Sequence, residues 1–337
     1  MASPVRRPGY GDRPPQDGLR ADDGELLTIV CCCFIRSGEG MDAPPIGTGD
    51  DSQVPARDWS ELPLDALASV FVKLGAIEIL MGAGLVCRSW LHAAKLPDLW
   101  RSVDMARHKV VDDIFDIFGV SPVEPKINCD VLCAMARVAV DRSRGQLEVF
   151  VAKRFVTDQL LEYIGDRSPA LKAVVLVSCC GVSNQGFTQL VARCPLLEDL
   201  MLVFCPKIGG RDVYEATGRA CPQLKRFRLK KRAFCFSAGK SGGEVLGFAA
   251  MHELRTLALA GSAVTNDELA SVLDGCPRLE SLDLRDCFNI VADDALRARC
   301  AGIESLVLPP LRLEVDDEDY EYETLCSRDV DFGGDSD

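Results

Sequence analysis

Apolar residues recur through the middle of the chain in the spacing L-x-x-L-x-L, with Val, Phe or Ile replacing some of the leucines. From one run to the next, the first residues lie 26, 27, 30, 25 and 24 positions apart. This spacing and this period are typical of leucine-rich repeats, in which each unit supplies a short strand and a helix. Leu147 lies 24 residues before the first run, and we expect an earlier, irregular repeat to begin there. The six runs are Leu171/Val174/Leu176, Leu197/Leu200/Leu202, Leu224/Phe227/Leu229, Leu254/Leu257/Leu259, Leu279/Leu282/Leu284 and Ile303/Leu306/Leu308.

The order of residues inside each run predicts which side chains are buried. Side chains alternate along a strand, so the second and third apolar residues of a run point to the same side, into the core of the solenoid. The ninth position turns back into the core and is often Asn or Cys, and here it is Cys179, Cys205 and Cys287 in three runs. The helix expected over Thr265–Leu273 begins at a capping residue, Thr265, and is followed by Cys and Pro. We therefore expect the recurrent cysteines to be small core residues.

Residues 58–101 follow a helical period instead. Pro63 suits the first turn of a helix, the apolar residues after it recur at helical spacing, and Gly75 is a typical stop. A second short helix is expected over Ile77–Met81 and a third from Gly84 onward. Helices this short cannot bury all of their large apolar side chains alone, so part of this surface is expected to meet a neighbour or a partner.

Three phrases in this segment resemble an F-box in their order and spacing: L-P-x-x-x-L-x-x-V-F at 62–71, V-C-R-x-W at 86–90 and L-W-R at 99–101. With the repeats behind it, the chain resembles the plant F-box/leucine-rich-repeat proteins of the cysteine-containing subclass over about residues 58–312. In that family the F-box docks on a Skp-type adaptor linked to a cullin, and the repeats hold a protein substrate for ubiquitin transfer. Both adaptor contact and internal packing stay open as roles for the signature residues. The adaptor-binding residues that the resemblance implies are Leu62, Pro63, Leu67, Phe71, Val86, Cys87, Trp90, Leu99 and Trp100.

These patterns predict an α/β chain. A small three-helix F-box is followed by a short solenoid, with parallel strands on its concave face and helices on its convex face. Pro- and Gly-rich or acidic composition at the two ends is typical of disordered tails. The expected divisions are a tail over 1–57, the F-box over 58–102, a helical connector over 103–146, the repeats over 147–312 and an acidic tail over 313–337.

Charge and composition narrow the range of partners. The net charge is −13, and segment 314–337 holds eleven acids and one base, so it carries ten of those negative charges. The negative net charge disfavours binding to nucleic-acid phosphates. The sequence has no apolar run of the roughly 18 residues that a membrane span needs, so a membrane is not expected as a partner. We expect the protein in the nucleus, the cytoplasm or both. The Cys31–Cys33 cluster is either a site of S-acylation or a short apolar stretch in a tail.

Candidate chemistry is sparse. The sixteen cysteines include no C-x-x-C pair and there are three His, so no zinc site is expected, and no cofactor is implied. There is no Walker loop and no H-E-x-x-H, and the one G-x-S-x-G string, Gly239–Gly243, lies in a long repeat rather than between a strand and a helix. We expect a non-catalytic chain that presents substrate to ligase machinery on other subunits. The alternative is a repeat scaffold that binds a partner without ubiquitin transfer.

One repeat strand carries only basic residues at its expected outward positions: Arg226, Arg228 and Lys230. Arg side chains pair with phosphate and carboxylate groups in a bidentate manner, so we expect an acidic or phosphorylated substrate segment to bind there. Asp283 and Arg285, two strands further along, belong to the same expected surface. A solvated strand and a nuclear-import sequence are the alternatives. Segment 314–337 is expected to occupy the same surface when no substrate is present.

Overall fold

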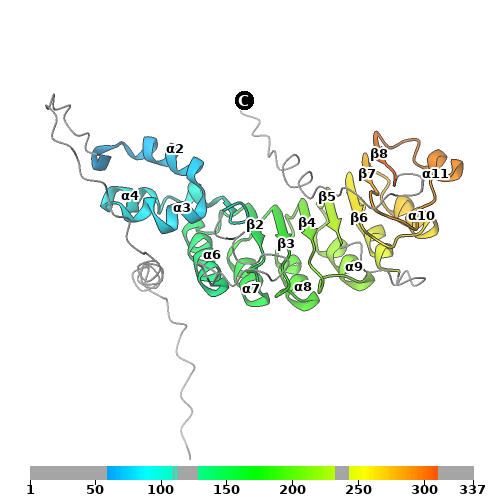
Figure 1. Cartoon of the computed structure of the whole chain (residues 1–337), viewed down its shortest axis with the longest axis horizontal. Coiled ribbons are helices and arrows are strands. Elements are labelled where there is room, and N and C mark those ends of the chain that lie inside the picture. The colour runs from blue at the N-terminus through cyan, green and yellow to red at the C-terminus, as the bar shows by residue number, and fades with distance from the viewer. Residues whose placement is uncertain (1–58, 109–110, 112–127, 232–242, 310–337) are drawn as a thin grey trace, which may run out of the picture.

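The computed structural model describes residues 59–108, 111, 128–231 and 243–309. Helices lie at one end of the molecule, and a row of strands backed by helices extends away from them (Figure 1). Both expected tails, the Cys31–Cys33 cluster and all but Gly243 of the G-x-S-x-G string lie outside the described residues.

The helical end follows the apolar pattern of the sequence. Helix α2 begins after Pro63, and it ends at Gly75, whose φ of 94° is a conformation that glycine adopts without steric cost. The third helix begins at Arg88 rather than near Gly84, because residues 83–85 form a 3-10 turn first. The helices here are α2 (Leu64–Leu74), α3 (Ala76–Met81) and α4 (Arg88–Ala93), and the 3-10 turns are η1 (Trp59–Glu61), η2 (Ala83–Leu85) and η3 (Pro97–Trp100).

No single described helix is long and apolar enough to cross a membrane. Only α2 taken together with residues 76–85 reaches the required length and composition, and that pair is bent by 119°.

The described strands form one parallel sheet in sequence order, β1 to β8. Equivalent positions of successive repeats lie side by side, so Leu200 is level with Phe227, and Phe227 with Leu257. This register confirms the repeat alignment, since each of these core residues is fully buried. The strands are β1 (Ser102–Asp104), β2 (Val149–Lys153), β3 (Ala173–Val177), β4 (Asp199–Val203), β5 (Arg226–Lys230), β6 (Thr256–Ala260), β7 (Ser281–Asp283) and β8 (Ser305–Val307).

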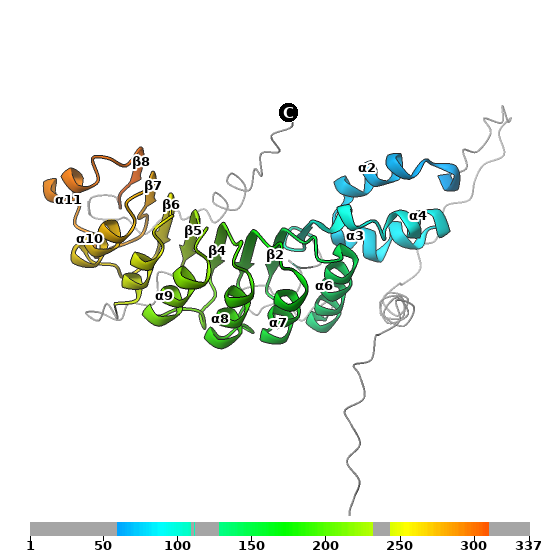
Figure 2. The same cartoon turned by 180° about the vertical axis from the view of Figure 1, so that it is seen from behind.

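Helices α6 to α10 all lie on the same side of the sheet, and its other side carries no described helix from these repeats (Figures 1 and 2). Side-chain caps fix where several of them begin: the Ser183 hydroxyl accepts a hydrogen bond from the Gly186 amide, and Thr265 forms a capping box with Glu268. The expected cap at Thr265 is therefore confirmed. These elements are α6 (Cys129–Ser143), α7 (Asp158–Arg167), α8 (Asn184–Arg193), α9 (Arg211–Ala220), η4 (Glu244–Ala250), α10 (Asn266–Gly275) and α11 (Asp294–Arg299).

The segment expected as a helical connector is also part of the sheet. It supplies the short strand β1, which pairs with β2, as well as helix α6. The helical end and the sheet share one hydrophobic core that runs from Leu67 to Cys300. At their junction the buried indole of Trp100 donates a hydrogen bond to the Ala94 carbonyl (2.9 Å), and the Arg142 guanidinium lies 5.3 Å from the Trp100 ring.

Most recurrent cysteines are core residues, as expected. Cys179 and Cys287 are fully buried, and burial raises the pKa of the Cys287 thiol to about 12. Cys205 differs from the expectation, because its side chain is only half-buried. A hydrogen bond from Cys179 lowers the pKa of Cys205. Among the ninth positions that the structure describes, Cys179, Ser262 and Cys287 are buried and Cys205 is half-buried.

Candidate functional site

The signature residues of the expected F-box fall into three groups by burial. Leu67, Phe71 and Trp100 are closed to solvent, each exposing 1% or less of its surface. In this structure these three side chains lie inside the domain, and their direct contact with an adaptor stays a prediction. They pack the domain: Phe71 meets the edge of Trp90 with ring centroids 5.6 Å apart, and Trp100 joins the helical end to α6.

A second group is half-buried and holds the helical end together. The indole of Trp90 donates a hydrogen bond to the Trp59 carbonyl (2.9 Å), and the Ser89 hydroxyl donates one to Ser60 (2.9 Å), which ties α4 to the turn before α2. Cys87 lies 3.1 Å from the Ser89 hydroxyl. Leu62 and Leu99 are the remaining members, and both pack against the core with part of their surface open.

The third group is exposed, and it includes residues that the signature does not name. Pro63 and Val86 belong to the signature, and Val86 exposes 60% of its surface. Helix α2 adds apolar side chains on the sides that do not face the core, of which Val72 is 70% exposed. A helix turns by about 100° per residue, so Val72 points away from the buried face of Leu67 and Phe71. An apolar residue outside the buried face of a helix is the feature of the sequence that could have predicted this exposed surface. The exposed apolar residues at this end are Trp59, Leu64, Val70, Val72, Leu74, Leu85 and Val86.

The face of the sheet that points away from helices α6 to α10, called the inner face from here on, carries the expected basic strand. The register places Arg226 and Arg228 beside Asp199 and Met201 of β4, and Lys230 beside Val203. Asp199 is 3% exposed and pairs with both arginines, at 2.9 Å from Arg226 Nε and 3.2 Å from Arg228 Nη2. The strand is basic at all three of its outward positions, and a buried carboxylate of the neighbouring strand offsets part of its charge.

The rest of this face is apolar toward β2 and basic at its carboxyl-terminal edge. The Lys230 ammonium lies 5.6 Å from the centre of the Phe204 ring, a cation–π arrangement. Lys153 occupies the equivalent last position of β2, because Lys153 is level with Val177 and Val177 with Val203. The apolar outward positions Val151, Ala173, Val175 and Val203 are almost closed to solvent.

Asp283 and Arg285 lie apart from the basic strand. Arg228 is level with Ala258, and Ala258 is level with Asp283, so two strand spacings, about 10 Å, separate Arg228 from Asp283. The Arg285 guanidinium binds the Asp283 carboxylate through Nε (2.8 Å). The structure does not bring this pair into one cluster with Arg226, Arg228 and Lys230.

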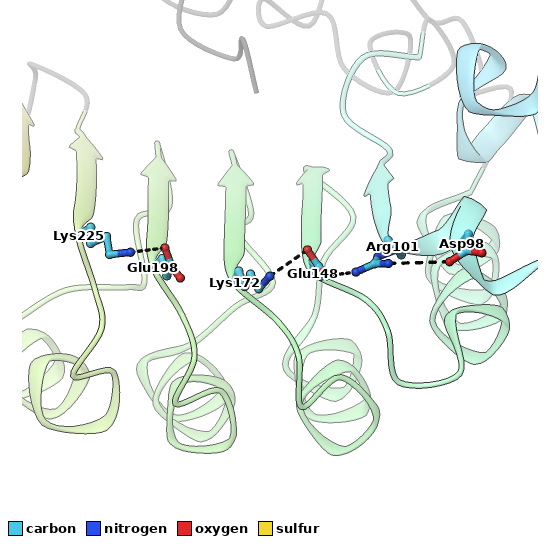
Figure 3. A network of polar contacts seen from close by, with 6 residues as sticks. All are labelled: Asp98, Arg101, Glu148, Lys172, Glu198 and Lys225. Carbon is cyan, nitrogen blue, oxygen red and sulfur yellow. Dashed lines mark hydrogen bonds and ion pairs between the residues drawn. The ribbon is translucent and has the colours of Figure 1, made fainter. Parts of the chain in front are cut away.

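Along the amino-terminal edge of the sheet, the residues just before strands β1 to β5 alternate in charge (Figure 3). The Glu148 carboxylate bridges Arg101 (2.5 Å) and Lys172 (3.2 Å), and Lys225 pairs with Glu198 (2.8 Å). The hydrogen bond from Arg101, followed by that from Lys172, lowers the pKa of Glu148. Because each of these bases already faces a carboxylate, this edge is a poor site for an acidic ligand.

Over residues 59–108, 111, 128–231 and 243–309, no three His, Cys, Asp or Glu side chains are grouped so that they could hold a metal ion. The cysteines there are free thiols.

Comparison with known proteins identifies the family. A family model described as F-box-like matches residues 59–106, and a model described as the LRR repeats of the FBD-associated F-box protein At5g56370 matches residues 208–314. F-box protein SKIP19 of Arabidopsis thaliana is 33% identical over 290 residues, which cover 83% of this chain and 89% of that protein. The chain belongs to the F-box/LRR-repeat family. The expected F-box, repeats and α/β fold are thereby confirmed.

Other relatives agree with this membership. The putative F-box/LRR-repeat protein 22 of A. thaliana is 34% identical, over 77% of this chain and 80% of its own length. The putative F-box/LRR-repeat protein 23 is 38% identical over 72% of this chain, which spans about half (51%) of that relative's length. A chain of the yeast Rad7 and Elc1 complex aligns over 52% of this chain and 54% of its own length at 12% identity, with a TM-score of 0.34, too low to bear on function.

Proposed function

We propose that this protein is the substrate-recognition subunit of a Skp–cullin–F-box ubiquitin ligase complex. The F-box helices bind a Skp-type adaptor, which connects them to a cullin, and the repeat sheet holds the protein substrate. The family implies this role, and F-box/LRR-repeat proteins are typically non-catalytic adaptor subunits. The chain acts in the nucleus, the cytoplasm or both, in agreement with the free thiols of its described cysteines.

One observation supports the adaptor contact above others: apolar side chains gather on the outside of the F-box. Val70, Val72 and Leu74 of α2 expose 45%, 70% and 38% of their surfaces, and Val86 exposes 60%. Burying a Val or Leu side chain fully contributes about 1.5–3 kcal/mol, so such a group can stabilise a complex even after the cost of association. An exposed apolar group of this kind is typical of a protein interface.

Adaptor capture by the full chain tests the proposal. Val72→Asp and Val86→Asp each place a carboxylate in the interface, and each should weaken binding to a purified Skp-type adaptor at least tenfold. The matched control is Val291→Asp, because Val291 is 65% exposed on the last repeats, far from the F-box, and undergoes the same chemical change. Leu62→Ala is a weaker test, since Leu62 also packs against the core.

The outcomes separate the two candidate functions. Equal adaptor binding by the wild type, both F-box variants and the control would overturn the docking surface. If the folded protein also fails to bring down a cullin through the adaptor after gentle purification, the alternative of a repeat scaffold without ubiquitin transfer replaces the ligase role.

A further inference from the structure

We propose that the inner face of strands β2 to β5 binds the acidic segment 314–337 of the same chain, which thereby competes with substrate. This inference deepens the proposed function, because it assigns a regulation to the surface that would hold substrate. It rests on the charge of that surface, on the charge of the segment and on the length of chain available.

The inner face is positive in spite of its buried carboxylate. Among the outward positions of β2 to β6, the positive side chains are Lys153, Arg226, Arg228 and Lys230, and Asp199 is the single negative one. Four positive charges and one negative charge leave a net charge of three. The guanidinium of Arg226 keeps much of its surface open, since its side chain is 53% exposed.

The positive side chains of this face extend from Arg226, the first residue of β5, to Lys153 and Lys230, the last residues of β2 and β5. Lys153 and Lys230 thus lie at the carboxyl-terminal edge. At the amino-terminal edge, Lys172 and Lys225 are paired with Glu148 and Glu198 (Figure 3). An acidic peptide is therefore attracted to the inner face and its carboxyl-terminal edge. Apolar side chains such as Met201 and the Phe204 ring lie within the same region and suit aromatic or aliphatic side chains of such a peptide.

The acidic segment has the complementary composition. It carries a net charge of −10, and its central part reads Asp-Asp-Glu-Asp-Tyr-Glu-Tyr-Glu at 316–323, so two tyrosines stand among the acids. The rest of the chain carries only −3. The charge of this segment is thus opposite to that of the basic strand.

The chain that follows the last described residue is long enough to reach strands β5 to β2. Three strand spacings, about 14 Å, separate β8 from β5, and six, about 29 Å, separate β8 from β2. The 28 residues that follow Pro309 reach up to about 90 Å when extended, so the segment can cross all of these strands. Exposed charges are screened beyond about 8 Å at physiological salt, so the segment must dock directly to be held.

Tethering makes even weak docking effective. A flexible tether of this kind gives an effective concentration on the order of 1 mM. A segment that binds with a dissociation constant of about 0.1 mM would then weaken the binding of a competing acidic peptide about tenfold.

The experiment uses the full chain and a labelled synthetic peptide of residues 313–337. In one variant, the six acids Asp316, Asp317, Glu318, Asp319, Glu321 and Glu323 are changed to Asn or Gln. The peptide should bind this neutralised chain about tenfold more tightly than the wild type, and the difference should shrink at about 0.5 M salt. In the neutralised background, Lys230→Gln should weaken peptide binding at least threefold. Lys207→Gln is the matched control, because Lys207 is exposed in the turn after β4 and loses the same charge.

Two results would overturn the inference. One is equal peptide affinity for the wild type and the neutralised chain. The other is an equal loss on Lys207→Gln and Lys230→Gln, which would show attraction to net charge without a site. Adaptor capture by the neutralised chain is measured in parallel: because it depends on α2 and not on the sheet, failure of the proposed function and failure of this inference are observed separately.

Discussion

Asp199→Asn tests how much the buried carboxylate under the basic strand stabilises the repeats. The amide keeps the shape of the side chain but removes the charge that faces Arg226 (2.9 Å) and Arg228 (3.2 Å). Two guanidinium groups on one strand would then lose the carboxylate that both of them contact. The substitution should therefore destabilise the fold.

The expected size follows from how much of each partner is buried. Exposed ion pairs contribute about 0–1 kcal/mol, and breaking a fully buried pair costs about 3–5 kcal/mol. Asp199 is 3% exposed, but the side chains of Arg226 and Arg228 are 53% and 19% exposed, so water screens the arginine side of the cluster. An intermediate loss of about 2 kcal/mol in the free energy of unfolding is expected.

Urea unfolding of the full chain, followed by circular dichroism, measures this loss. With a urea dependence of about 2–3 kcal/mol per molar, the midpoint should fall by about 0.7–1 M. Asp283→Asn is the control. Asp283 lies on β7, level with Arg228 of β5, and its partner Arg285 has a side chain that is 44% exposed. The expected loss in the free energy of unfolding is therefore below about 1 kcal/mol. If Asp199→Asn costs no more than Asp283→Asn, the buried carboxylate is not a structural counter-ion of the basic strand.

Two further results follow from the repeat register. Leu282→Ala should cost about 2–5 kcal/mol in the same urea assay, because Leu282 is fully buried, whereas its neighbour Asp283→Ala should cost much less; similar losses would contradict the assigned register. In native thiol labelling at pH 7, Cys287, with its pKa raised to about 12, should react at least about 100-fold more slowly than exposed Cys180. Comparable rates, read by mass spectrometry, would place Cys287 outside the core.

The repeat strands could be predicted from the sequence because their signal is local. Leu282 and its counterparts recur at a fixed spacing, and alternation along a strand decides which of them are buried. Strand β1 lacks that spacing, and it forms only because Ser102–Asp104 can pair with β2 across a long connection. A strand of three residues that depends on a distant partner leaves no periodic pattern.

Parts of the candidate site could not be predicted from the sequence, because they also depend on contacts between distant residues. Trp100 matches the F-box signature, but its environment is made by Ala94 and by Arg142, a residue from the first helix behind the sheet. Asp199 lies one repeat period, 27 residues, before Arg226, so the repeat alignment already places them level, but only the structure shows that Asp199 is buried and contacts both Arg226 and Arg228. Cross-strand neighbours of this kind decide the net charge of a surface, and sequence patterns along one strand do not reveal them.

The shared core at Trp100 fixes the position of the sheet relative to the F-box. With the helical end and β1 joined by packed side chains, each strand stands at a set distance from α2, and each repeat adds one step of about 4.8 Å. The basic strand β5 is the fourth step, about 19 Å from β1. Inserting or deleting one repeat between them would leave the chemistry of both surfaces unchanged and would still move whatever β5 holds by one step relative to whatever α2 holds.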